Sequence, residues 1–219
     1  AVITELAKIP VLVGGNGRKQ APGGSDVFNP EAWDAIFTSR GLPTFRAILI
    51  AAGRTHARDW GLSFTADDSV VQRWTGERVA LWSRLANEET GRMIAEEIRA
   101  GVAGGESIKQ MQMRIEGVFD FASVVRTERI ARTETLSLSS AGHLAVYEQS
   151  KVVAELMWLA TLDDRVRDGH RAAHRQRVPV GVPFLVGGEA LTAPGIGGSA
   201  ANVINCRCTT VPIVAKGAA

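Results

Sequence analysis

The pattern of apolar residues changes near Lys151, and this change constrains the fold more than any other feature of the chain. Before it, apolar residues recur at the three- and four-residue spacing of amphipathic helices. After it, the apolar run 152–160 is typical of a strand, and Pro and Gly become frequent from 179 to 198. A terminal strand is expected at 208–214, where Pro212 favours a sheet edge. The sequence therefore predicts an α+β protein with a mainly helical N-terminal part and a small β-rich C-terminal module.

Three segments are expected along the chain. Residues 1–28 are predicted to be a flexible or extended arm, because 14–25 is rich in Gly and has no apolar period. Residues 29–150 are predicted to form a helical domain. Residues 151–219 are predicted to form the β-rich module, which carries an Asp-Arg-His motif and an Asn-Cys-Arg-Cys motif.

Apolar spacing and capping residues divide the helical domain into shorter helices. Pro30 is well placed in a first helical turn, and Asp67 or Asp68 can cap a later helix. Gly residues between 101 and 105 are expected to end a helix. The helices are predicted at about 30–37, 45–60, 68–82, 87–101, 107–115 and 123–149.

Soft metal ligands gather near the C-terminus. The two cysteines of the chain, Cys206 and Cys208, lie one residue apart, and His170 and His174 lie four apart. Residues i and i+2 share a face of a strand, and residues i and i+4 share a face of a helix. Two such pairs could form a tetrahedral zinc site, with a spacing unlike the common zinc patterns. The alternative, which we favour, has no cofactor: His170 hydrogen-bonds in the core, the cysteines pack as small buried groups, and His174 is exposed.

Charged residues accompany these ligands. Asp163 can pair with Arg165 or Arg167, and such pairs would hold the loop against Asn205–Cys208, where Arg207 separates the cysteines. A charge network of this kind is more often structural than catalytic. We predict that one structural cluster contains Asp163, Arg165, Arg167, His170, Asn205, Cys206, Arg207 and Cys208.

Arginines are also dense in this segment. Five occur within thirteen residues, at Arg165, Arg167, Arg171, Arg175 and Arg177. They could contact the phosphates of DNA. Alternatively, they could form a solvated face that is offset by Asp163, Asp164 and Asp168. The net charge of the chain is only +2, so its overall charge does not decide between the two.

Several function classes lack their usual signatures. The chain has no Gly-rich phosphate loop, nucleophile elbow or His-Glu-x-x-His motif, so we predict that it is not an enzyme. It has no run of 18 apolar residues, so we expect no membrane segment. Two cysteines do not make a disulfide framework, which favours a reducing compartment.

A series of short motifs occurs along the chain between Gly101 and Cys208. These are Gly101-x-x-x-Gly105-x-Ser107, Ile130-Ala-Arg-Thr-Glu134, Trp158-x-Ala160, Asp163-x-Arg165-Val-Arg167-x-x-His170, Pro183-Phe184, Pro194-Gly195 and Asn205-Cys-Arg-Cys208. Over about residues 65–214, this order resembles the phage Mu protein F-like head-morphogenesis family of minor capsid proteins. The resemblance does not extend to the first 60 residues.

The resemblance implies a structural protein of a tailed bacteriophage or a related prophage. Its expected place is the virion head or portal region, and the host cytoplasm during assembly. Its expected partners are the portal protein and the major capsid or scaffold proteins in a multi-copy assembly, with packaged double-stranded DNA as a further partner. The alternative class is a nuclease or transferase effector that uses Asp163, His170 and His174. Some relatives carry extra cysteines near this position, but the two cysteines here exclude a four-cysteine site.

Overall fold

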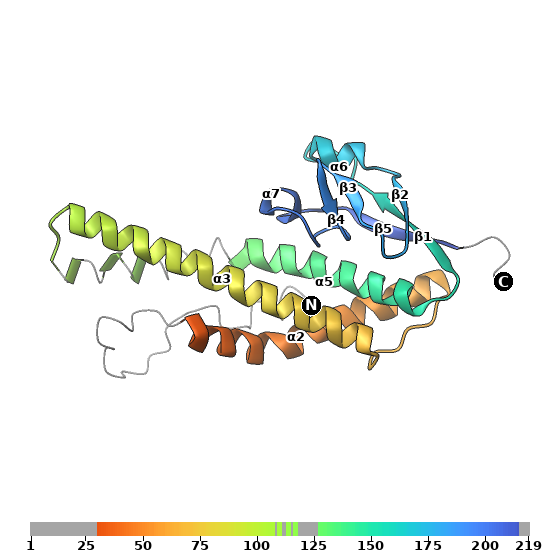
Figure 1. Cartoon of the computed structure of the whole chain (residues 1–219), viewed down its shortest axis with the longest axis horizontal. Helices are drawn as coiled ribbons and strands as arrows, with labels where there is room; N and C mark the ends of the chain where they lie inside the picture. The colour runs from red at the N-terminus through yellow and green to blue at the C-terminus, as the bar shows by residue number, and fades with distance from the viewer. Residues whose placement is uncertain (1–29, 108, 111–112, 115, 118–126, 215–219) are drawn as a thin grey trace.

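Three long helices lie side by side, and a small β-rich module covers the bundle on the side of α5 (Thr127–Gln149) (Figure 1). The computed structural model describes residues 30–107, 109–110, 113–114, 116–117 and 127–214. The α+β class predicted from the sequence is confirmed. The predicted arm at 1–28 lies outside the described residues, as do much of the helix expected at 107–115 and the start of the one expected at 123–149.

The first two helices are longer than predicted, because two expected breaks are absent. Helix α2 spans Pro30–Trp60 and runs through Pro43. Helix α3 spans Ser69–Ala103 and runs through Asn87. Predicting separate helices at these two places was therefore wrong.

Packing explains why both helices continue. Proline removes one backbone donor and clashes with the preceding turn, but Phe45 in the next turn is buried against Trp82 with ring centroids 5.3 Å apart. Burial of these rings offsets the cost of Pro43. Asn87 is itself buried, and no Gly or Pro stands between Trp82 and Asn87 to end α3. The predicted cap at Asp68 is confirmed, since its carboxylate accepts a hydrogen bond from the Val70 amide at 2.8 Å.

Helices α2 and α5 approach closely at one glycine. A Cβ atom on Gly142 would lie 2.5 Å from the carbonyl oxygen of Leu49, so no larger residue fits without moving a helix. Farther along the bundle, helix side chains alone form an apolar cluster. Its buried members are Phe45, Ile48, Val79, Trp82, Ala131 and Leu138.

The module contains a three-stranded antiparallel sheet with the order β2-β1-β5. The central strand β1 (Val153–Leu159) pairs with β2 (Arg177–Pro179) on one side and with β5 (Thr209–Val214) on the other. Pro212 lies in β5, which has a partner on one side only within the described sheet, as its missing backbone donor favours. The edge position predicted for Pro212 is confirmed.

Shorter elements complete the module. Strands β3 (Phe184–Val186) and β4 (Glu189–Leu191) form a hairpin. Helices α6 (Asp168–Ala172) and α7 (Ala200–Val203) are each about one turn long. None of the helices in the described part of the chain is long and apolar enough to cross a membrane.

One apolar core joins the bundle to the module. Leu49 from α2 and Tyr147 from α5 belong to the same buried cluster as Trp158 from β1, Phe184 from β3 and Leu191 from β4. The elements change type between Gln149 and Val153, but the packing is continuous across that point. The core therefore fixes the sheet on the helices and positions the site described next.

Candidate functional site

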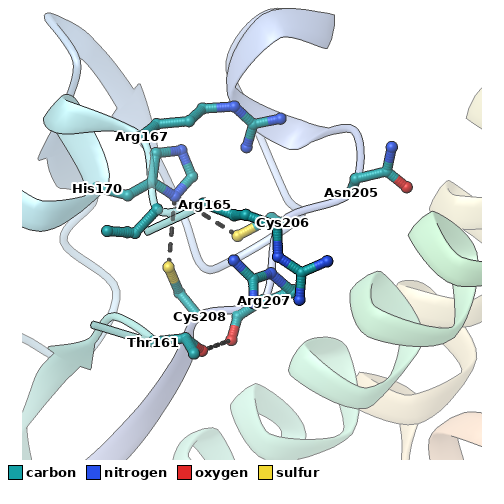
Figure 2. A pocket seen from close by; sticks show the side chains of 9 residues that line it. Thr161, Arg165, Arg167, His170, Asn205, Cys206, Arg207 and Cys208 are labelled. Carbon is teal, nitrogen blue, oxygen red and sulfur yellow. Dashed lines mark hydrogen bonds between the residues drawn. The ribbon is translucent and has the colours of Figure 1, made fainter. Parts of the chain in front are cut away.

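His170, Cys206 and Cys208 form a buried group that we call the thiol–imidazole cluster. His170 comes from α6, and both cysteines lie in the segment directly before β5 (Figure 2). Nδ1 of His170 lies 3.3 Å from Sγ of Cys208 and 3.6 Å from Sγ of Cys206. Only 2% of His170 is exposed, and the three candidate ligand atoms lie within 4.8 Å of one another.

Close backbone contacts place the His170 side of this cluster. Gly169 packs directly on the β3–β4 turn, where a Cβ atom would lie 2.6 Å from Cα of Gly187. The His170 ring stands edge-on to Trp158, with centroids 5.8 Å apart and an interplanar angle of 72°. These contacts fix the direction of the imidazole, and its Nε2 atom is buried without a hydrogen-bond partner among the described residues.

A tight turn places the cysteines. Asn205 has a left-handed backbone with a φ of 54°, which Asn tolerates better than most residues. Its amide donates to the hydroxyl of Thr133 on α5 at 3.3 Å. The turn thereby leads the chain from α7 back toward His170, so that both thiols face the same imidazole nitrogen (Figure 2).

The two thiols differ in acidity. The pKa of Cys206 is lowered to about 6, mainly by a hydrogen bond from Cys208 and in smaller part by the nearby His170, against the opposing effect of burial. The pKa of Cys208 is raised, because its S–H group donates a hydrogen bond to the Cys206 sulfur and because it is buried. The first proton thus leaves the pair at lower pH than from a free thiol.

An ion pair ties the loop before α6 to the segment between the cysteines. The guanidinium of Arg207 binds the Asp163 carboxylate through two nitrogens, one of them at 2.7 Å. The hydrogen bond from Arg207 lowers the pKa of Asp163 to about 2, so the carboxylate stays ionised. Thr161 adds a hydrogen bond of 2.7 Å to the Arg207 carbonyl oxygen.

The remaining members of the predicted structural cluster surround this pair. Arg167 donates from its guanidinium to the carbonyl oxygen of Ile204, and the Arg165 amide donates to the Asp163 carboxylate at 3.1 Å. All eight residues of that prediction therefore lie in one region. A small pocket, with room for about one water molecule, opens beside the thiols. Thr161, Arg165, Val166, Arg167, His170, Asn205, Cys206, Arg207 and Cys208 line it (Figure 2).

His174 takes a different position. Its Nδ1 atom accepts a hydrogen bond from the Ala160 amide at 3.2 Å, and it does not join the group of candidate ligand atoms in the described part of the chain. The structure thus brings together three of the four residues that the sequence analysis proposed for zinc. His174 instead holds the end of α6 against β1.

The five arginines proposed for DNA do not form a uniform set. Arg171 reaches back to the carbonyl oxygen of Asp163 at 2.9 Å, and Arg167 binds Ile204 as described. Arg165, Arg175 and Arg177 are exposed on the module. Two of the five therefore have a structural hydrogen bond, and one of these two, Arg171, is exposed like the other three.

The sequence analysis missed a buried ion pair between α3 and α5. Nε of Arg78 lies 2.6 Å from Oε2 of Glu134, and Nη2 lies 2.8 Å from Oε1. Both side chains are buried, which makes the pair costly to disrupt. Glu134 is the last residue of the Ile130–Glu134 motif. Its position on a helix face that also carries core residues was the signal in the sequence that its carboxylate is buried.

A second group that was not predicted from the sequence connects α2, α5 and β5. Tyr147 on α5 donates its hydroxyl proton to the Thr210 carbonyl oxygen at 3.0 Å, so Nε2 of His56 on α2 must donate to Tyr147 at 2.7 Å. The His56 ring stacks on His143 at 3.8 Å. Burial, together with the neighbouring His56, lowers the pKa of His143 to about 4, so both imidazoles are neutral at pH 7.

Comparison with known proteins connects this geometry to a family. Residues 92–211 match the family model described as phage Mu protein F like protein. The matched stretch contains Glu134, Asp163, His170 and Asn205–Cys208. No solved structure is significantly similar to the chain.

Two curated relatives are similar over much of the chain. The minor head protein GP7 of Bacillus phage SPP1 is 31% identical over 166 residues, which are 72% of this chain and 53% of that protein. A protein of Enterococcus faecalis named NAD(+)--arginine ADP-ribosyltransferase EFV is 29% identical over 142 residues, which are 64% of this chain and 29% of that protein. The chain thus spans about half or less of these relatives. Because the family model covers more than half of the chain, including the buried site, the chain belongs to the phage Mu protein F like family.

Proposed function

We propose that this chain is a structural minor head protein that acts in the assembly of a tailed bacteriophage head. The observation that carries the proposal is its 31% identity to the minor head protein GP7 over 72% of its length. The family model covers residues 92–211, which include Trp158, Phe184 and Leu191 of the shared core, so members of the family are expected to share this scaffold. The proposed location is the virion head, after assembly in the host cytoplasm.

The end of α3 far from the module is the proposed docking surface for a head partner. Val102 is 66% exposed there, and Ile98, one turn earlier on the same face of α3, is also exposed. Apolar side chains at the end of a long helix suit a contact with another protein better than a contact with water. We propose the portal protein, or a capsid or scaffold protein on the inside of the head, as that partner in a multi-copy assembly.

DNA is a weaker proposed partner. Arg165, Arg175 and Arg177 are exposed on the module and could contact phosphates of packaged DNA. Arg167 and Arg171 already hold backbone carbonyl groups and are less available. A contact of this kind would have a steep salt dependence and no sequence preference.

The geometry favours this structural role over catalysis at the Asp163, His170 and His174 site. The Asp163 carboxylate is held by Arg207, His170 is buried, and His174 accepts a backbone hydrogen bond. The relative named as an ADP-ribosyltransferase is matched over only 29% of its length, so its name carries little weight for this chain. Transfer of ADP-ribose from NAD(+) to arginine by the purified chain would overturn the structural assignment.

A binding experiment tests the proposal. The tagged chain is produced together with its cognate portal and capsid proteins, and the particles are separated by sedimentation. We expect the chain to sediment with the particles, and we expect Val102→Asp to weaken this by about tenfold or more, because a charge would be desolvated at the contact. Leu162→Asp is the matched control, since Leu162 is 55% exposed but lies in the module. Equal recovery of both variants would exclude the α3 surface.

A further inference from the structure

We propose that the thiol–imidazole cluster binds one Zn²⁺ ion through Nδ1 of His170 and Sγ of Cys206 and Cys208. The site is independent of the head-assembly role and would be retained if that role were disproved. It departs from the interpretation without a cofactor that we favoured from the sequence, and it differs from the four-ligand zinc site considered there, because His174 is not a ligand.

The distances in the cluster suit a tetrahedral ion. With Zn–S bonds of about 2.3 Å and a Zn–N bond of about 2.0 Å, two ligands of a tetrahedron are about 3.6 Å apart from nitrogen to sulfur. The observed distances from Nδ1 of His170 are 3.3 Å to Cys208 and 3.6 Å to Cys206. The two distances from the imidazole nitrogen therefore need shifts of only a few tenths of an ångström, and all three ligand atoms already lie within 4.8 Å of one another.

The polar atoms of the cluster are poorly satisfied by one another. Nδ1 of His170 has one proton or one lone pair, yet two buried sulfur atoms face it. Nδ1 can form one of these two contacts as a hydrogen bond, and the thiols form another between themselves, but a metal ion serves all three atoms at once. Buried polar groups without full partners are costly, so this arrangement favours a ligand in the centre.

The donor set selects the ion by its chemistry. Two thiolates and one neutral imidazole are soft to borderline ligands, which suit Zn²⁺ and do not suit Mg²⁺ or Ca²⁺. Two thiolates also balance the charge of Zn²⁺, so the buried centre would be neutral. A neutral centre avoids the cost of burying an isolated charge.

Three protein ligands leave one tetrahedral position for a small molecule. The pocket beside the thiols offers room for a water molecule on that side, next to Arg165 and Arg167 (Figure 2). The hydroxyl of Thr161 is already bonded to the Arg207 carbonyl oxygen, and no fourth Cys, His, Asp or Glu joins the group among the described residues. We assign the fourth position to water.

The ion would link segments that are distant in sequence. His170 and Cys208 are 38 residues apart, and the strands of the module are short. Closing such a loop costs conformational entropy, which metal binding offsets in small domains. Zinc would therefore stabilise the module more than the helical bundle.

The test measures metal content and binding in the whole chain. We expect about one zinc per chain in protein purified from zinc-supplemented cells. Titration with p-hydroxymercuribenzoate should release that zinc as the two thiols react. Co²⁺ added to the metal-free protein should give the absorption band of a thiolate-to-cobalt charge transfer.

A matched pair of variants separates zinc binding from simple hydrogen bonding. In His170→Asn, the amide group can still hydrogen-bond to sulfur near the former Nδ1 position but is a poor zinc ligand. His174→Asn keeps an acceptor for the Ala160 amide and changes no proposed ligand. We expect His170→Asn and Cys208→Ser to lower zinc content by about tenfold or more, while His174→Asn keeps it.

Two results would overturn the proposal. One is native protein with far less than one zinc per chain that also gives no charge-transfer band when Co²⁺ is added. The other is unchanged zinc content in His170→Asn and Cys208→Ser. The first result uses only the native chain, so the proposal can be disproved even where a variant fails to fold.

Discussion

The helical bundle and the C-terminal module are stabilised in different ways. The bundle has three described helices of 23 to 35 residues, whose side chains alone form a second apolar cluster. The described strands of the module have 3 to 7 residues, and its segments are connected through the Asp163–Arg207 pair and the thiol–imidazole cluster. Short elements bury little surface of their own, so the module depends on directional contacts and on a core shared with the bundle.

The largest effect is expected where the shared core is removed. Trp158→Ala should lower the free energy of unfolding by about 3–5 kcal/mol, because a fully buried ring that contacts Phe184 and His170 is lost. Trp60→Ala is the control, since Trp60 is 44% exposed and lies outside the shared core. Urea unfolding followed by circular dichroism measures both. Similar losses in the two variants would mean that the shared core is not what holds the module.

Acid should destabilise the contact between α2 and α5 that the stacked rings of His56 and His143 form. The folded state keeps both imidazoles neutral, with the pKa of His143 lowered to about 4, whereas the unfolded chain takes up protons below about pH 6.5. Their contribution is therefore complete above about pH 6.5 and is lost as the pH falls toward 4, by up to roughly 3 kcal/mol for His143. Thermal unfolding between pH 7 and pH 4 measures it. His143→Gln should make this dependence shallower, and an unchanged slope would contradict the assignment.

A smaller effect is expected at the hydrogen bonds between the bundle and β5. Tyr147→Phe removes the hydroxyl that joins His56 to the Thr210 carbonyl oxygen and leaves both groups buried without it. We expect a loss of about 1–3 kcal/mol in the free energy of unfolding. In the variant, hydrogen exchange should be faster for the amides of β5 than for those of the bundle. This difference would locate the loss of stability at this contact. A variant as stable as the native chain would show that the contact is dispensable.

The smallest effect is expected at the partly exposed ion pair. Asp163→Asn keeps the shape of the side chain but weakens its bidentate contact with Arg207. The melting temperature should fall slightly, and amide exchange should rise locally in the loop before α6. Asp164→Asn is the matched control, because Asp164 is exposed beside it. If both changes act alike, the loop is not held by this pair.

The sequence predicted the features that depend on local pattern. The α+β class, the Asp68 cap and the edge position of Pro212 all follow from spacing and from the chemistry of one residue. Helices α2 and α3 were wrongly divided, because the burial of Phe45 against Trp82 that carries α2 past Pro43 is a tertiary contact. Local propensity cannot report such a contact.

Most residues of the candidate site were also named from the sequence, but the contacts between them were not. The close spacing of Cys206 and Cys208 and the density of charge pointed to this region, and the structure places these residues side by side. The sequence does not show that only His170 faces the sulfurs. The orientation of its ring depends on packing against Trp158, which is a tertiary contact. The Arg78–Glu134 pair joins residues 56 positions apart on different helices, and periodicity gives no partner for either charge.

The presence of the chain in purified phage heads tests the central claim most directly. Heads assembled with the tagged chain are purified by density gradient, and their protein content is measured by quantitative mass spectrometry. We expect each head to contain a fixed, low number of copies of the chain. These copies should be retained after high-salt washing, since a docked structural component contacts protein and not only DNA. Heads of normal yield and composition that contain none of the chain would contradict it.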